Sequence, residues 1–391
     1  MNALLDRIFD EFGLIVSGWS AEYDHALVEA IERSKSRRYS MFWTTLGEPA
    51  DSAERLITFR HATTVRIFSA DAFFRAVADN VVALEKYGTT HPLSIAAAVA
   101  RLKAYLALPE QNRISVHELI TDAANHLCSA LAQYREPRNA HSDGAVLLDE
   151  MTKLEKHSEL LITLVVTGMW WGDDSQRGVW RSVFTRLVSQ QDALPGFHSP
   201  NLKLYPALLA TYAAGIACCG AGNYALLNEL LNGAKVVFPD RKAALGAELY
   251  PCQVLSKTTG HLLPDLNRHH TPVSDYLWLR LRPLFKDLLP DDSEYEDCFD
   301  RFEYLLALNV AFHRLDTERN PWGPVGRFGW KSRANNGVAV YDVVGREAEA
   351  AQQDWPLLRA GFFAGDLTRF RELQKYFVET MMPAVAREWL Y

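Results

Sequence analysis

The sequence predicts a small α/β region, a three-stranded parallel sheet forming half of a Rossmann-like fold, followed by a large all-α region, so that the chain is mainly helical overall. Apolar runs that suit strands alternate with amphipathic segments through the first 86 residues. Beyond residue 92 the apolar residues follow a helical period almost throughout, with short breaks marked by Gly and Pro. At 391 residues the chain is long enough for two or three domains of roughly 100–200 residues each.

The N-terminal region contains three predicted strands, each followed by a helix. An amphipathic helix at Met1 comes first, and it lacks the apolar core of a secretory signal. The predicted strands are a run from Phe12 to the Gly18-Trp19-Ser20 turn, then residues 39–44, then 63–68. Helices are predicted over 22–33, 51–60 and 71–86. Strands that alternate with helices of this length pair in parallel through right-handed crossovers.

The pattern changes near residues 88–92, which we predict to be the domain boundary. Residues 1–88 form the first domain and residues 89–391 the helical domain, with a division of the latter near 233–272, the least regular segment. The helical periodicity predicts helices over 93–108, 115–135, 145–169, 176–190, 205–219, 224–232, 273–289, 294–315, 341–363 and 366–389.

Composition narrows the class of protein. Hydrophobic residues make up 48% and charged residues 23%, as in an ordinary soluble globular protein, and the net charge of −7 argues against general nucleic-acid binding. The five cysteines contain no C-x-x-C pair, which favours reduced thiols in a cytoplasmic protein and argues against zinc or another metal. The uncharged segment from Leu204 to Asn228 contains several Gly residues and a Pro, so we expect a buried helix and no membrane association.

Gly18-Trp19-Ser20 is the first candidate site, with three interpretations. In the first, backbone N–H groups and the Ser20 hydroxyl at a helix start bind a nucleotide ribose or phosphate. In the second, Ser20 is the nucleophile of an α/β hydrolase; against it, residue 22 is Glu where the nucleophile elbow has a second Gly. In the third, the turn only connects strand to helix.

The segments Gly13-Leu-Ile-Val-Ser-Gly-Trp-Ser-Ala-Glu-Tyr-Asp24, Tyr39-Ser-Met-Phe-Trp43 and Ser69-Ala-Asp-Ala-Phe-Phe74 resemble the closing portion of bacterial SIR2-like (sirtuin-like) domains. The likeness covers about residues 5–86. It implies an NAD site that Gly18 and Ser20 contact, with Trp19 and Trp43 as weaker candidates. The helical remainder, with His91-Pro-Leu-Ser94 and Asn320-Pro-Trp-Gly-Pro-Val-Gly-Arg-Phe328, is similar to the C-terminal region of such proteins, some of which are antiphage NAD-degrading effectors.

The resemblance also implies what this chain lacks. The family's Gly-rich phosphate loop, its Asn/Asp elements and its catalytic His precede the matched portion, and the sequence shows no counterpart of them. The implied protein is therefore a truncated or split member with an incomplete site for NAD or an ADP-ribose-like nucleotide. It is expected to be inactive as an NAD hydrolase alone and to act as a regulatory or sensor piece. The alternative is a non-catalytic helical module that binds a ligand or protein and carries a structural α/β cap.

Residues 320–333 are the second candidate site. Trp322, Phe328 and Trp330 alternate with Arg327 and other basic residues, a mixture that can stack on a base and neutralise phosphate, as a sensor loop in the helical domain would. The alternative is a packed loop whose aromatic residues anchor it to neighbouring helices.

A sheet of three parallel strands has two open edges, and such sheets are usually covered on both faces. We therefore expect a protein partner, a homo-oligomer or the helical domain to cover the N-terminal sheet.

Overall fold

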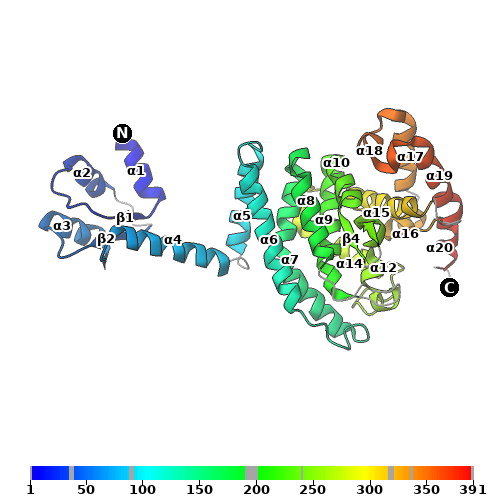
Figure 1. The fold of residues 1–391 in the computed structure, drawn as a ribbon, viewed down its shortest axis with the longest axis horizontal. Helices are drawn as coiled ribbons and strands as arrows, with labels where there is room; N and C mark the ends of the chain where they lie inside the picture. Colours follow the sequence, from blue (N-terminus) through cyan, green and yellow to red (C-terminus); the bar gives the residue numbers. More distant parts are fainter. Residues whose placement is uncertain are drawn as a thin grey trace. The chain divides into compact units, whose positions relative to one another are not determined.

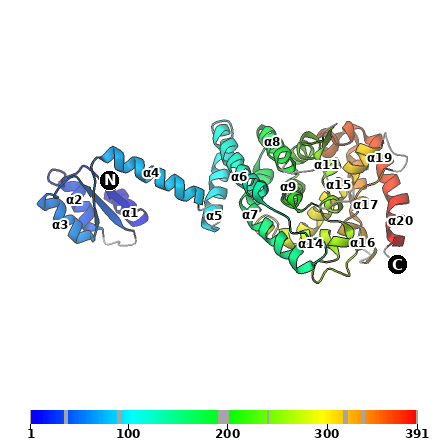
Figure 2. The same ribbon diagram turned by 60° about the horizontal axis from the view of Figure 1, so that its bottom comes forward.

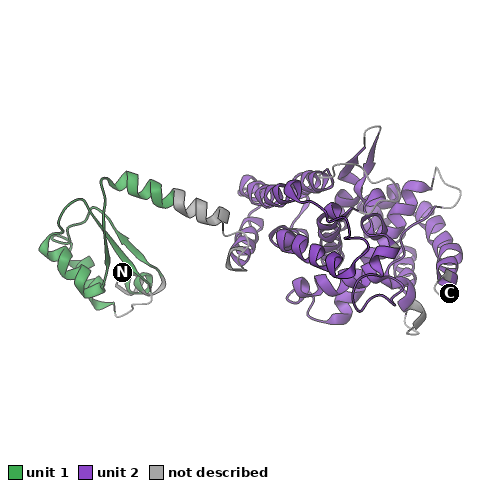
Figure 3. Ribbon diagram, turned by 90° about the horizontal axis from the view of Figure 1, so that it is seen from below, with its two compact units in different colours: residues 1–88 green, residues 89–391 purple. Residues whose placement is uncertain are grey.

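The computed structural model describes residues 2–34, 39–87, 92–189, 201–238, 241–315, 321–334 and 338–388. The chain divides into two compact units, residues 1–88, here called the α/β unit, and residues 89–391, the helical unit (Figures 1 and 3). Helices dominate, and one small parallel sheet lies in the α/β unit. The predicted fold class is confirmed.

The sheet of the α/β unit has three parallel strands in the order β1-β2-β3. Strand β1 spans Leu14–Val16, β2 spans Met41–Thr45 and β3 spans Thr63–Arg66. In the register of the sheet, Ile15 lies beside Phe42. Strands β1 and β2 begin two residues later than predicted, β2 ends one residue later, and β3 ends two residues earlier. Errors of this size are usual for sequence-based boundaries.

Four helices accompany this sheet, and their ends follow from local side chains. They are α1 (Asn2–Glu11), α2 (His25–Arg33), α3 (Asp51–Arg60) and α4 (Ala70–Tyr87). The Asp24 side chain caps α2 by accepting a hydrogen bond from the Leu27 backbone N–H at 3.1 Å. His61, with φ of 51°, ends α3. The buried apolar residues of the unit form one small core: Phe9, Val16, Ala21, Val28, Ala30, Ile31, Met41, Trp43, Ala53 and Leu56.

Part of the sheet remains exposed within this unit. Ile15 and Phe42, neighbours in the register, are 43% and 38% exposed. Strand β3 carries no buried side chain, and Phe68 just beyond it is fully exposed. The apolar side chains of Ile15 and Phe42 therefore lie on a face that the helices of the unit leave partly open.

The helical unit is built around α9 (Tyr205–Ala221), whose residues are almost all buried. Helix α7 (Gly144–Trp171) and helix α15 (Asp292–Arg314) pack against α9 from different sides (Figure 2). Gly215 lets α9 approach α15, because a methyl group there would overlap the Phe302 ring.

Among the described residues, the segment Leu202–Ala221 is long and apolar enough to cross a membrane, and 89% of its 18-residue apolar window is buried inside the unit. The interpretation of this segment as a buried core helix is confirmed. Its apolar surface is used for packing between helices.

The other helices of the unit are α5 (Pro92–Leu106), α6 (Arg113–Gln133), α8 (Arg177–Val188), α10 (Tyr224–Asn228), α11 (Leu245–Glu248), α12 (Pro251–Val254), α13 (Lys257–Gly260), α14 (Pro272–Leu281), α16 (Arg327–Ala334), α17 (Val340–Ala351), α18 (Pro356–Arg359), α19 (Leu367–Tyr376) and α20 (Met382–Glu388). Tighter or wider helical turns cover Asp174–Gln176, Leu202–Leu204, Glu229–Gly233, Arg282–Phe285, Gln352–Asp354, Phe362–Gly365 and Phe377–Met381.

Two of the long predicted helices are interrupted. The predicted helix over 341–363 is wrong beyond Ala351, because Gln352 has a φ of 51° and Pro356 starts a new turn. The predicted helix over 273–289 ends as an α-helix at Leu281, where Pro283 follows. Apolar periodicity continued through both breaks, so the pattern alone did not show them.

A short antiparallel hairpin also departs from the all-α prediction. Strand β4 spans Lys235–Val237 and β5 spans Lys242–Ala244. Three residues per strand are too few to establish an alternating pattern. The hairpin therefore left no regular pattern of apolar residues in its part of the segment 233–272.

Candidate functional site

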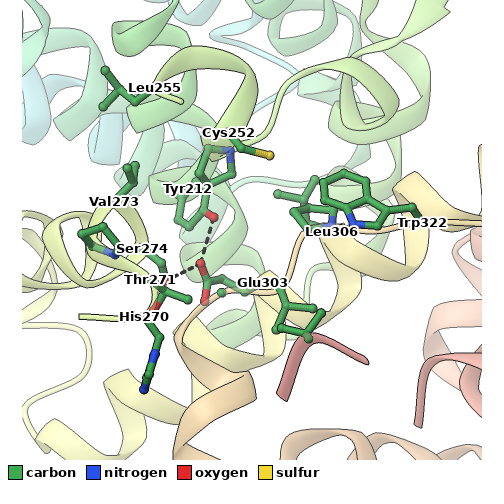
Figure 4. A pocket seen from close by; sticks show the side chains of 16 residues that line it. Tyr212, Cys252, Leu255, His270, Thr271, Val273, Ser274, Glu303, Leu306 and Trp322 are labelled. Carbon is green, nitrogen blue, oxygen red and sulfur yellow. Dashed lines mark hydrogen bonds between the residues drawn. The ribbon is translucent and has the colours of Figure 1, made fainter. Parts of the chain in front are cut away.

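A cavity of about 200 Å³ lies in the helical unit between segments that are far apart in the sequence. Helices α9, α12, α14 and α15 and the segment 321–326 line it, and Figure 4 shows their side chains turned toward a common space. The lining residues are Tyr212, Pro251, Cys252, Leu255, His270, Thr271, Pro272, Val273, Ser274, Glu303, Leu306, Trp322, Pro324, Val325, Gly326 and Val385. Most of them are apolar, as is usual for small-molecule pockets.

Glu303 is the charged group at the centre of this pocket. Its neighbours Phe299, Phe302 and Leu306 direct that face of α15 into the core, and Glu303 itself is 2% exposed. One carboxylate oxygen, Oε1, accepts hydrogen bonds from the Tyr212 hydroxyl at 2.9 Å and the Ser274 hydroxyl at 2.7 Å (Figure 4).

The other oxygen of Glu303, Oε2, accepts a hydrogen bond from the backbone N–H of Arg327 at 3.0 Å. The same N–H also lies 3.0 Å from the Ser274 hydroxyl oxygen. All three donors to Glu303 are therefore neutral groups. A buried carboxyl group with partners on both oxygens is tolerated in the interior because its polar atoms are satisfied.

Burial raises the pKa of Glu303 to about 8. Removal from water is the main cause, and the nearby charge of Asp300 raises the pKa further. The hydrogen bonds from Ser274 and Tyr212 and the charge of Arg327 lower it. At neutral pH Glu303 is therefore mostly a carboxylic acid. This neutral form can donate a hydrogen bond as well as accept one.

The segment 321–326 closes one side of the pocket. Trp322 lies against Tyr250, with ring centroids 5.6 Å apart, and the Arg314 guanidinium lies 5.4 Å from the Trp322 ring. Gly323 passes so close to the backbone of α15 that a side chain at that position would overlap the Ala307 carbonyl. The segment is thus seated directly on the helix that carries Glu303.

A charged cluster adjoins the pocket on the outer part of α15 and on α16. The Arg327 guanidinium bonds to Glu296 at 2.7 Å and lies 4.1 Å from the Trp278 ring. Lys331 Nζ lies 2.8 Å from both Glu296 and Asp300. Burial raises the pKa of Asp300 to about 6, while the neighbouring Lys331 and Arg327 lower it.

The predicted sensor residues have different environments. Segment 320–333 was expected as one loop, but helix α16 begins at Arg327; Asn320 lies outside the described residues. Trp322 lines the pocket and is 37% exposed. Phe328 is buried between Tyr304 and Phe377.

Trp330 donates its indole N–H to the Thr271 hydroxyl at 3.0 Å, and the Arg327 side chain is buried. Arg327, Phe328 and Trp330 therefore anchor the segment, which was the alternative interpretation. Of the four predicted sensor residues, Trp322 is the one whose ring lines the cavity.

Sequence analysis missed Glu303, Tyr212 and Ser274. The available signal was a lone acidic residue, Glu303, within the apolar run from Phe302 to Leu306. A carboxylate inside an otherwise buried helix face indicates either a paired charge or a site. Tyr212 and Ser274 carried no comparable signal, because their convergence on Glu303 depends on tertiary packing.

The Gly18-Trp19-Ser20 turn differs from its predicted geometry. Helix α2 begins at His25, not near Glu22, so Ser20 does not lie at the helix start. Neither an anion site at the helix N-terminus nor a nucleophile elbow is formed by Ser20, since both need strand, turn and helix in direct succession. Gly18 has a φ of +69°, a conformation that favours glycine.

The two tryptophans that were weaker cofactor candidates pack on each other. The Trp19 and Trp43 rings are stacked with centroids 5.6 Å apart, and Trp43 is 2% exposed. Trp43 therefore belongs to the core of the α/β unit.

Among the described residues, no group of three or more His, Cys, Asp or Glu side chains is placed to hold a metal ion. The fold and the pocket define a mainly helical protein with a small Rossmann-like parallel sheet and a buried carboxyl group in an apolar cavity. No family model matches the chain, and no curated protein and no solved structure matches it either.

Proposed function

We propose that the helical unit is a non-catalytic ligand-binding module whose site is the pocket around Glu303 and Trp322. The observation that carries this proposal is the convergence of Tyr212, Ser274 and the Arg327 backbone N–H on one buried carboxyl group in a largely apolar cavity. A few fixed polar groups in an apolar, concave site are what specific small-molecule binding needs. In this proposal the protein is cytoplasmic and the α/β unit has a structural role.

The size of the cavity limits the ligand. An apolar cavity of about 150 Å³ holds a benzene molecule. A cavity of about 200 Å³ is therefore suited to a ligand with one ring and one or two polar substituents. A whole dinucleotide is too large for it.

The proposal is tested by ligand-observed NMR with a set of single-ring compounds that are neutral, cationic or anionic. We expect at least one charge class to bind wild-type protein and to bind Trp322→Ala at least ~10-fold more weakly, a loss of about 1.4 kcal/mol. Trp171→Ala is the matched control, because Trp171 is exposed and does not line this pocket. Absence of binding by all three classes of compound contradicts the proposal. Equal binding to wild type and to Trp322→Ala also contradicts it.

We propose as a second candidate that the α/β unit is a SIR2-like nucleotide-binding remnant. The chain would then be a regulatory or sensor piece of an NAD-consuming antiphage defence system, inactive alone. The supporting observation is the parallel order β1-β2-β3 with Gly18 in a left-handed turn just after the carboxyl end of β1. Open α/β sheets bind ligands beyond the carboxyl ends of their strands.

This second candidate is tested by calorimetric titration with NAD and with ADP-ribose, together with a nicotinamide-release assay on the same sample. Binding without release supports it. Absence of binding shows that Gly18 and Ser20 form only a structural turn, and substantial NAD cleavage contradicts the predicted inactivity.

A further inference from the structure

We infer that the pocket selects a small amine, with its ammonium group on the Glu303 carboxylate and its apolar ring or chain against Trp322 and Leu306. The inference rests on the proposed ligand-binding function and adds the chemical class of the ligand. It follows from a comparison of two buried carboxylates, from the charges around the pocket and from proton linkage.

Glu155 on α7 is a second buried carboxylate, and its negative charge is compensated by a cationic side chain. Glu155 is 5% exposed and accepts hydrogen bonds from the hydroxyls of Tyr205 at 2.6 Å and Tyr276 at 2.9 Å. Its second oxygen pairs with Arg280 Nε at 2.5 Å. Arg280 thus neutralises the Glu155 carboxylate in addition to the two hydroxyl donors, as a buried charge requires.

Glu303 also accepts hydrogen bonds from two hydroxyl groups, those of Tyr212 and Ser274, but among the described residues a cationic side chain does not complete the set. In the part of the chain that the structure describes, Glu303 forms no ion pair, and its remaining partner is the neutral backbone N–H of Arg327. The carboxyl group lines a cavity instead. A ligand ammonium there would supply the charge that Arg280 supplies to Glu155.

The titratable groups around the pocket are compatible with a bound cation. They are Tyr212 on α9, the exposed Cys252 on α12, His270 before α14, Asp300 on α15 and Arg327 on α16. The Arg327 guanidinium donates a hydrogen bond to Glu296 and lies over the Trp278 ring. Among the described lining residues Glu303 is the one with a carboxyl group.

Proton linkage predicts a measurable effect, the release of a proton when an amine binds. With its raised pKa, Glu303 holds a proton at neutral pH when no ligand has been added. When an ammonium binds, the carboxyl group ionises and releases this proton to solvent, while the amine keeps its own. Amine affinity therefore rises as the pH approaches about 8, and a neutral ligand releases no proton.

The test is isothermal titration calorimetry with benzylamine, benzyl alcohol and benzoate at neutral pH, in phosphate and in Tris. These buffers have different ionisation enthalpies, so the heats report proton release. We expect benzylamine to bind at least ~10-fold more tightly than either analogue and to release close to one proton per molecule bound. Glu303→Gln should abolish both the preference and the release; the proton count on wild-type protein tests the inference even if this variant is unstable.

The outcomes separate the two proposals. Benzyl alcohol or benzoate binding as tightly as benzylamine, or benzylamine binding without proton release, overturns the amine inference and leaves the pocket as a ligand site. Failure of all three compounds to bind overturns the inference and counts against the proposed function as well.

Discussion

Gly326 and Glu303 lie so close together that a methyl group on Gly326 would overlap the Glu303 carboxylate. The missing side chain lets the chain pass over the carboxyl group, so that the next backbone N–H, that of Arg327, donates to Glu303 Oε2. The carboxyl group at the centre of the pocket is therefore hydrogen-bonded to the residue that directly follows the segment 321–326.

Gly326→Ala should destabilise the helical unit. The added methyl group must displace the carboxylate or the backbone, and overpacking of this kind costs about 1–3 kcal/mol. The free energy of unfolding, measured by urea denaturation with far-UV circular dichroism, checks this. Gly178→Ala is the control: nothing lies near Gly178 in α8, and Ala is a better helix former, so this variant should be as stable as wild type or slightly more stable.

Glu303 should make the stability of the protein fall as the pH rises. Its pKa in the folded state, about 8, lies above the ordinary value of 4.5, so the folded state binds the proton more tightly than the unfolded state does. The stabilising contribution is therefore complete below about pH 4.5 and is lost progressively up to about pH 8.

Urea denaturation of wild type and Glu303→Gln at about pH 5 and about pH 8 measures this contribution. Wild type should lose more stability than the variant across this interval. The smaller contribution from Asp300 ends near pH 6 and is present in both proteins. Parallel loss of stability in both proteins would show that Glu303 does not hold its proton in the folded state.

Arg327→Ala should be destabilising. The guanidinium is buried, bonds to Glu296 at 2.7 Å and stacks on Trp278. Removal of the side chain loses the charge-assisted hydrogen bond to Glu296 and the packing on Trp278, a loss of about 1.5–3 kcal/mol, while Lys331 still pairs with Glu296. Arg327→Ala is thus unsuitable as a test of ligand binding, because loss of binding would accompany loss of stability.

Arg371→Ala provides the comparison for Arg327→Ala. Arg371 also pairs with a carboxylate, Glu349, but both side chains are exposed, so little change in stability is expected. Thermal denaturation of both variants checks the contrast, and equal stability of the two would contradict the buried role of Arg327.

The open face of the sheet in the α/β unit should promote self-association, as expected if a second copy covers it. Ile15 and Phe42 are adjacent, apolar and partly exposed. Replacement of both by Thr, which suits strands, should reduce association without unfolding the sheet. Sedimentation velocity over a range of protein concentrations measures this; the replacement Phe59→Thr on α3, at another exposed position, should have less effect.

The sequence predicted what depends on local pattern. Every predicted helix from 93–108 to 294–315 has a counterpart, and the parallel strands follow from their alternation with helices. The breaks at Gln352 and Leu281 were missed, because the apolar period continues across them. The start of α2 was missed because Asp24, its cap, follows residues that also suit a helix.

The pocket depends on contacts that the sequence does not display. Tyr212 and Glu303 are 91 residues apart, and Ser274 is 29 residues from Glu303. The sequence identified Trp322 through its aromatic and basic surroundings, but the same pattern also selected Phe328, which is core. Residue type alone does not distinguish a ring that lines a cavity from one that fills the interior.

The central claim is that Glu303 holds a proton at neutral pH when no ligand has been added. The most direct measurement is a pH titration followed by NMR of protein labelled with ¹³C at the glutamate side-chain carboxyl groups, with Glu303→Gln to assign the signal. We predict one carboxyl signal that titrates near pH 8 and is missing from the variant. Titration of Glu303 near its ordinary pKa of 4.5 would contradict the claim.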